Sequence, residues 1–125
     1  MIKIFALLAC VLAFIYIVMS PTKEEYARIH AAKQDIRRLD DKIKEFRQTT
    51  GRFFGKEGWF SLLKNREVEE NSFLNRILVR NGMPIDPWGN PYMYKYPGKT
   101  KEFDIISYGA DGKAGGVGED SDISN

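Results

Sequence analysis

Three aspartates, Asp111, Asp120 and Asp122, lie in a glycine-rich segment at the end of this chain. Residues 111–122 contain four glycines and four carboxylates but very few apolar side chains, so hydrophobic packing cannot fix their conformation. Calcium takes roughly six to eight oxygen ligands from carboxylates and backbone carbonyls, and glycine lets the backbone bend around such an ion. We therefore expect a structural calcium site, with the three aspartates as ligands and the backbone carbonyls of Tyr108 and Val117 completing the shell.

A second interpretation of this segment is a disordered acidic tail. The EF-hand spacing fails because Lys113 stands where an Asp or Asn ligand belongs. The stretch 115–120 resembles one turn of a glycine-rich calcium β-roll, but that architecture needs several stacked copies. From the residues alone, the disordered tail and the metal loop are equally well supported.

The composition disfavours most other kinds of chemistry. The chain has 125 residues, a net charge of +2, one cysteine (Cys10) and one histidine (His30). It cannot form an internal disulfide, and one residue of each kind cannot build the usual zinc site. His30 lies in a charged segment, where we expect a solvated side chain rather than a catalytic one. We predict no enzymatic activity, no nucleic-acid partner and no small-molecule substrate, because the acidic residues lack the opposed environments that tune a general acid and base.

An apolar run from Ile4 to Met19 opens the chain, preceded by Lys3. As a helix it would be about 24 Å long, slightly short of the ~30 Å hydrocarbon core of a bilayer. A cleaved signal peptide and a lipoprotein signal at Cys10 are alternatives, but neither has a convincing cleavage site. We favour an uncleaved anchor, whose positive N-terminus stays in the cytoplasm while the rest of the chain crosses the membrane.

A second, charged helix is predicted from about Lys23 to Gln48. Thr22 and Glu25 form a capping box, and Gly51 gives the C-terminal stop. Its apolar positions follow a spacing of three and four residues: Ile29, Ala32, Ile36, Leu39, Ile43 and Phe46. This stripe can pair with another copy or pack on the chain's own downstream half, and we favour packing within the chain.

The C-terminal half predicts short helices and a β-hairpin. One helical turn is expected at residues 58–63, and another begins at Asn71 or Ser72 and continues to Leu78. Turn residues at 86–91 precede two predicted strands, 92–96 and 103–108. We expect Tyr92, Tyr94, Phe103 and Ile105 to pack on the long helix. The predicted fold class is therefore α+β, with residues 1–20 as a membrane segment and 21–125 as a head built on a helical spine.

The blocks Asp86-Pro87-Trp88-Gly89-Asn90-Pro91-Tyr92, Ser107-Tyr108-Gly109-Ala110-Asp111-Gly112-Lys113 and Glu119-Asp120-Ser121-Asp122-Ile123 resemble the major pseudopilins of type II secretion systems in order and spacing. The resemblance covers roughly residues 30–123. It implies a pilin-like fold, in which a half membrane-embedded helix carries a small head that ends in a calcium loop. It also places Asp111, Asp120 and Asp122 where the acidic calcium ligands are expected.

The resemblance further implies a structural subunit that assembles with its own copies and with other pseudopilins. Such a subunit is anchored in the inner membrane by a single pass, with its head in the periplasm, and supports protein export across the outer membrane. Two alternatives remain open. One is an unprocessed, membrane-anchored relative that accompanies the filament, since Phe5 stands where a mature pseudopilin has glutamate if Met1 is the mature start. The other is a coiled-coil adaptor with a disordered acidic tail.

Overall fold

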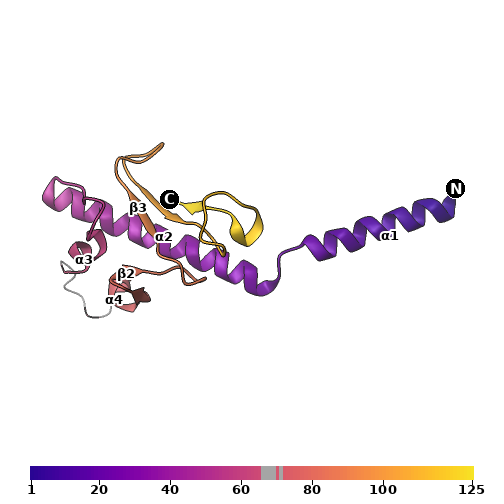
Figure 1. Ribbon diagram of the computed structural model, residues 1–125, viewed down its shortest axis with the longest axis horizontal. Coiled ribbons are helices and arrows are strands. Elements are labelled where there is room, and N and C mark those ends of the chain that lie inside the picture. Colours follow the sequence, from indigo (N-terminus) through magenta and orange to yellow (C-terminus); the bar gives the residue numbers. More distant parts are fainter. Residues whose placement is uncertain (66–69, 71) are drawn as a thin grey trace.

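The computed structural model describes residues 1–65, 70 and 72–125 of the chain (Figure 1). Two long helices, α1 and α2, are followed by short helices and strands that lie along α2. The elements are α1 (Ile2–Met19), α2 (Lys23–Thr50), α3 (Trp59–Lys64), α4 (Phe73–Arg76), β1 (Val79–Arg80), β2 (Met83–Pro84), β3 (Met93–Lys95), β4 (Asp104–Ser107), the 3-10 helix η1 (Gly118–Asp120) and β5 (Ile123–Ser124). The α+β prediction is confirmed.

Helix α1 projects away from the rest of the molecule (Figure 1). None of its residues is buried. Among the described residues, it is the one helix long and apolar enough to cross a membrane, with a mean hydropathy of 2.7 over its 18 residues. Helix α1 ends at Met19 because Ser20 is extended, with ψ at 134°, and Pro21 follows.

Helix α2 begins and ends through local hydrogen bonds that the sequence predicts. The Glu25 amide donates to the Thr22 hydroxyl at 3.2 Å, and the Thr22 amide donates back to the Glu25 carboxylate at 2.5 Å. At the other end, Gly51 adopts φ 71° and its amide donates to the Arg47 carbonyl at 2.8 Å. The helix continues to Thr50, two residues beyond the predicted end, because Gly51 is the first residue to leave helical geometry.

The apolar stripe of α2 packs inside the chain. Ala32, Ile36, Leu39 and Ile43 are buried, and Ile29 and Phe46 at the two ends of the stripe are partly buried against the same core. The other core residues come from the segment after α2, from α3 and α4, and from the strands of the sheet and the residues that flank them: Phe54, Trp59, Phe60, Leu63, Leu74, Tyr92, Tyr94, Phe103, Ile105 and Ile123. Packing within the chain is therefore the correct alternative, and the stripe is not exposed as a coiled-coil seam.

A three-stranded antiparallel sheet in the order β3-β4-β5 lies on α2. Tyr94 pairs with Ile105 in the predicted hairpin, and both side chains are buried. Both strands are shorter than predicted. The third strand was not predicted: Ile123 pairs with Ser107 after the glycine-rich loop, so the end of the chain is part of the sheet. A disordered acidic tail is therefore the wrong alternative for this segment.

The helix predicted from residue 72 to Leu78 is too long. Ser72 caps α4 by accepting a hydrogen bond from the Leu74 amide at 3.3 Å, but Ile77 is already extended at ψ 140°. Residue 71, the other predicted cap, lies outside the described residues. The chain then forms the β1–β2 hairpin, because Asn81 and Gly82 both adopt positive φ, at 53° and 75°. An Asn-Gly pair with positive φ at both residues is well suited to a two-residue hairpin turn.

Two polar contacts tie the sheet to α2. The buried Tyr92 hydroxyl donates to the Asp35 carboxylate at 2.9 Å, and burial raises the pKa of both groups. The Asn125 side chain donates to the Asp40 carboxylate at 2.8 Å and accepts from the Ile105 amide at 3.0 Å. Both contacts fix the position of the sheet along the helix, which apolar packing alone does not specify.

We predict that Leu39→Ala lowers the free energy of unfolding by about 2–5 kcal/mol, because it removes a fully buried side chain and leaves a cavity. Urea unfolding of the full chain in detergent micelles, followed by tryptophan fluorescence, measures the change. Leu62→Ala is the matched control, since Leu62 is 52% exposed on α3. Equal losses in the two variants would contradict the assignment of the α2 stripe as core.

Candidate functional site

The segment between β4 and β5 forms a closed loop. Its two ends meet where the Ala110 amide donates to the Glu119 carbonyl at 2.7 Å. Gly109 makes this approach possible: its φ is 73°, and a Cβ there would lie 2.3 Å from that carbonyl oxygen. Gly116 has φ 96°, and a Cβ there would lie 2.4 Å from the Asp120 carbonyl oxygen. Close backbone approach at these two glycines gives the loop a defined shape without an apolar core.

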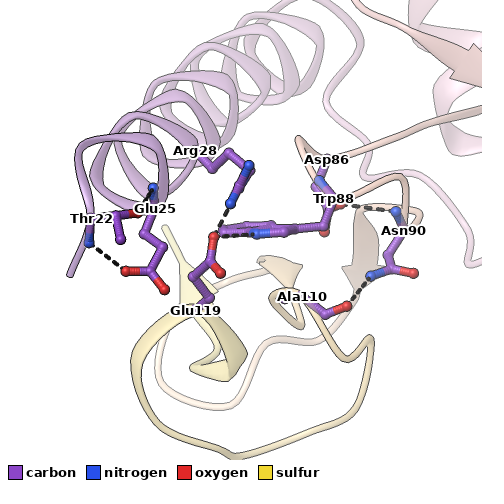
Figure 2. A network of polar contacts seen from close by, with 8 residues as sticks. All are labelled: Thr22, Glu25, Arg28, Asp86, Trp88, Asn90, Ala110 and Glu119. Atoms are coloured by element: carbon purple, nitrogen blue, oxygen red, sulfur yellow. Dashed lines mark hydrogen bonds and ion pairs between the residues drawn. The ribbon is translucent and has the colours of Figure 1, made fainter. Parts of the chain in front are cut away.

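The Glu119 carboxylate anchors the loop to the rest of the molecule (Figure 2). One of its oxygens, Oε1, accepts hydrogen bonds from Arg28 Nε at 2.8 Å and from Trp88 Nε1 at 3.1 Å. The bond from Arg28, followed by the bond from Trp88, holds the pKa of Glu119 below its usual range. Three segments distant in sequence, the first turns of α2, the turn after β2 and the loop, therefore meet at one carboxylate.

The turn at residues 86–90 supports the loop from the other side. The buried Asp86 carboxylate accepts from the amides of Trp88 and Asn90 at 3.1 and 2.9 Å, and from the Ser107 hydroxyl at 2.7 Å. Asn90 in turn donates its side-chain amide to the Gly109 carbonyl at 2.9 Å, at the start of the loop. Asp86 thus orients both the turn and the residues from which the loop departs.

All three predicted aspartate ligands lie in this loop. Asp111 is exposed, and its Oδ1 accepts from the Lys113 amide at 3.0 Å. Asp122 is also exposed, and its Oδ1 accepts from the Gly115 amide at 3.0 Å. Asp120 is partly buried in η1 and has no side-chain partner among the described residues. Two of the three carboxylates therefore fix the loop backbone, while that of Asp120 is uncommitted.

The two predicted backbone ligands occupy different places in the loop. Val117 lies at its outer part with a side chain 84% exposed, and its carbonyl accepts from the Asp120 amide at 3.1 Å. Tyr108 is the first residue of the loop after β4, and its ring lies under the Lys95 ammonium, which is 5.6 Å from the ring centroid. In the described part of the chain, no three His, Cys, Asp or Glu side chains converge as a metal site. Asp111, Asp120 and Asp122 share the loop, but the structure does not bring their three carboxylates together into one cluster.

The residues that hold the loop were not identified as site residues from the sequence. Arg28 and Glu119 are 91 positions apart, and no local pattern connects them. Asp86 and Asn90 were recognised only as turn formers. The sequence does contain one local indication, the spacing Asp86-x-Trp88-x-Asn90. With this spacing one carboxylate can accept hydrogen bonds from two backbone amides that follow it.

Comparison with known proteins gives a consistent result. The family model for type II secretion system protein G matches residues 19–125. A type II secretion system core protein G from Aeromonas hydrophila is 32% identical over 105 residues, which cover 82% of this chain and 71% of that protein. A protein of the same description from Pseudomonas aeruginosa is 58% identical over 43 residues, 34% of this chain. That local match spans 30% of the Pseudomonas protein's own length.

A solved structure shares the fold. The crystal structure of the major pseudopilin from the type 2 secretion system of enterohaemorrhagic Escherichia coli superimposes with a TM-score of 0.59. The superposition covers 86% of this chain and 92% of the other, at 24% sequence identity. The resemblance seen in the sequence and the arrangement of helix and sheet therefore agree.

We predict that Glu119→Gln lowers the melting temperature of the full chain in detergent at pH 7, because it removes the charge paired with Arg28. The pKa of folded Glu119 is lower than its usual 4.5, so its contribution to stability is present above that pH and is lost as the pH falls through the folded pKa. The difference between the two proteins should therefore shrink under acidic conditions.

Thermal unfolding between pH 3 and 7 checks this prediction. Glu57→Gln changes the same charge at an exposed position of the segment between α2 and α3 and serves as the control. A Glu119→Gln protein as stable as wild type at pH 7 would show that the anchor is dispensable.

Proposed function

Because this chain belongs to the type II secretion system protein G family, we propose that it is a structural subunit of a secretion pseudopilus that supports protein export across the outer membrane. The observation that carries the proposal is the family match over residues 19–125, which includes the whole described head. The role is structural, and we assign no catalytic residue.

We further propose that α1 anchors the subunit in the inner membrane by a single pass, with the head in the periplasm. Every residue of α1 is exposed in the isolated chain, including Leu12, Phe14 and Ile17. Exposure of such a large apolar surface to water is energetically unfavourable, so the helix needs lipid or the corresponding helices of other subunits around it. Lys3 near its start supports a cytoplasmic N-terminus. Self-assembly with its own copies and with other pseudopilins follows from the same exposed helix.

A structural calcium ion in the glycine-rich loop is also part of the proposal. Asp111, Asp120 and Asp122 share one loop with a net charge of −3 over residues 111–125. Carboxylate and carbonyl oxygens are the ligands that calcium prefers, and the ion would reduce the repulsion between the carboxylates. The backbone carbonyls of Tyr108 and Val117 are the proposed additional ligands. When bound, calcium would stabilise a loop that polar contacts alone hold against the sheet.

The filament role predicts that expression of the chain with the inner-membrane components of its own secretion system yields filaments in the sheared cell fraction. Val11→Asp, near the centre of α1, should abolish both filaments and membrane association, because a central aspartate disfavours insertion by about 2.5–3.5 kcal/mol. Leu62→Asp introduces the same charge on the exposed face of α3 and should leave membrane association unchanged. Cell fractionation and negative-stain microscopy measure both properties. Failure of the native chain to enter filaments would refute the role.

The calcium proposal predicts that millimolar CaCl2 raises the melting temperature of the full chain in detergent and that Asp120→Ala abolishes the increase. Differential scanning calorimetry with and without a chelator makes the measurement. Asp41→Ala, which removes an exposed carboxylate of α2, is the control and should keep the full response. If millimolar CaCl2 leaves the melting temperature unchanged, the metal assignment is overturned, while the filament role is unaffected.

A further inference from the structure

A pocket of about 400 Å3 lies between α2, α4 and the segment that follows β2. Its apolar lining comes from Phe73, Ile77, Leu78, Ile85 and Pro87. Leu78 is 70% exposed and the neighbouring Val79 is 42% exposed, so the apolar surface continues outside the pocket. The protein thus exposes connected apolar surface on its head, away from the membrane helix.

The two basic residues that line this pocket, Arg38 and Arg76, are both exposed. Arg38 lies over the Phe73 ring at 5.3 Å, and Arg76 is exposed on the last turn of α4. The two carboxylates that line the pocket are already engaged: Asp86 accepts three hydrogen bonds, and Asp35 accepts one from Tyr92. An occupant with an apolar centre and acidic flanks therefore fits this surface, which we call the basic pocket.

The glycine-rich loop has that combination. Val117 is 84% exposed, an unusual exposure for an aliphatic side chain, and Gly116 and Gly118 on either side leave it unshielded. Asp120 and Asp122 follow closely, and residues 111–125 carry a net charge of −3. The loop lies on one side of α2, whereas α4 and β2 lie on the other (Figure 1). Val117 therefore cannot fill the basic pocket of its own molecule.

We propose that the basic pocket of one subunit receives the Val117 loop of a second copy of this chain. The two surfaces differ and lie on different sides of the molecule, so the contact is heterologous. Each subunit would insert its Val117 loop into one neighbour and receive the Val117 loop of another in its basic pocket. Contacts of this kind form rings when the rotation between subunits closes and open helical filaments when it does not, and the filament role corresponds to the second case. The inference rests on the proposed filament role and specifies which head surfaces of neighbouring subunits meet.

Cysteine crosslinking in assembled filaments tests the contact. One tagged copy carries Val117→Cys and a differently tagged copy carries Leu78→Cys, both in the otherwise native chain and expressed together with the secretion components. Mild oxidation of the sheared filaments should give a disulfide-linked species that contains both tags. Strains with only one of the added cysteines identify any product that involves the native Cys10 in the membrane helix.

Two matched variants distinguish this contact from general crowding. Leu62→Cys, on the exposed face of α3 outside the pocket, replaces Leu78→Cys as the positional control and should give little product with Val117→Cys. Arg76→Glu should lower the 117–78 product roughly fivefold by placing like charges together, whereas Lys56→Glu, the same charge change elsewhere, should not.

Filaments that form normally but give no 117–78 product, or that give as much 117–62 product, would overturn this contact and leave the filament role intact. An Arg76→Glu subunit that enters filaments and crosslinks as efficiently as the native one would also overturn it. A native chain that never enters filaments would refute the filament role itself, and this contact with it.

Discussion

The Glu119 carboxylate is the contact on which the loop and its position depend. The loop between β4 and β5 buries almost nothing, so it needs polar contacts in place of apolar packing, and Arg28 and Trp88 supply two of them to a single oxygen. These contacts join the first turns of α2 to the end of the chain. They also set where β5 begins, because η1, which contains Glu119, leads directly into Ile123. The charge pair therefore acts together with the β4–β5 hydrogen bonds in placing the third strand of the sheet.

Because the Glu119 contacts already hold the loop in place, a calcium ion bound there would stabilise only part of it. The loop ends already meet at Ala110 and Glu119, and the amides of Lys113 and Gly115 are satisfied by aspartate oxygens. These polar contacts do not offset the electrostatic repulsion between the carboxylates of this short segment. A divalent ion would act on that repulsion and on the uncommitted Asp120, so its effect should be greatest on the outer part of the loop around Val117.

Sequence patterns predicted the elements whose signals are local. The capping box at Thr22, the stop at Gly51 and the apolar stripe of α2 each depend on residues within a few positions, and all were confirmed. The β1–β2 hairpin was missed because an Asn-Gly pair such as Asn81-Gly82 occurs both after helix ends and in hairpin turns. Strand β5 was missed because two residues carry no periodicity, and the Arg28–Glu119 pair because only the folded chain brings the two residues together. The calcium ligands remain a prediction from composition and resemblance.

The short break at Ser20 and Pro21 has a mechanical consequence. A continuous α-helix transmits bending as well as pulling, because each backbone hydrogen bond resists a change of axis. Here Ser20 is extended and Pro21 has no amide hydrogen to donate, so the ladder of hydrogen bonds is interrupted between α1 and α2. Such a link carries tension along the chain but little torque. The proposed membrane helix α1 and the head can therefore change their mutual tilt at this link without unwinding either helix.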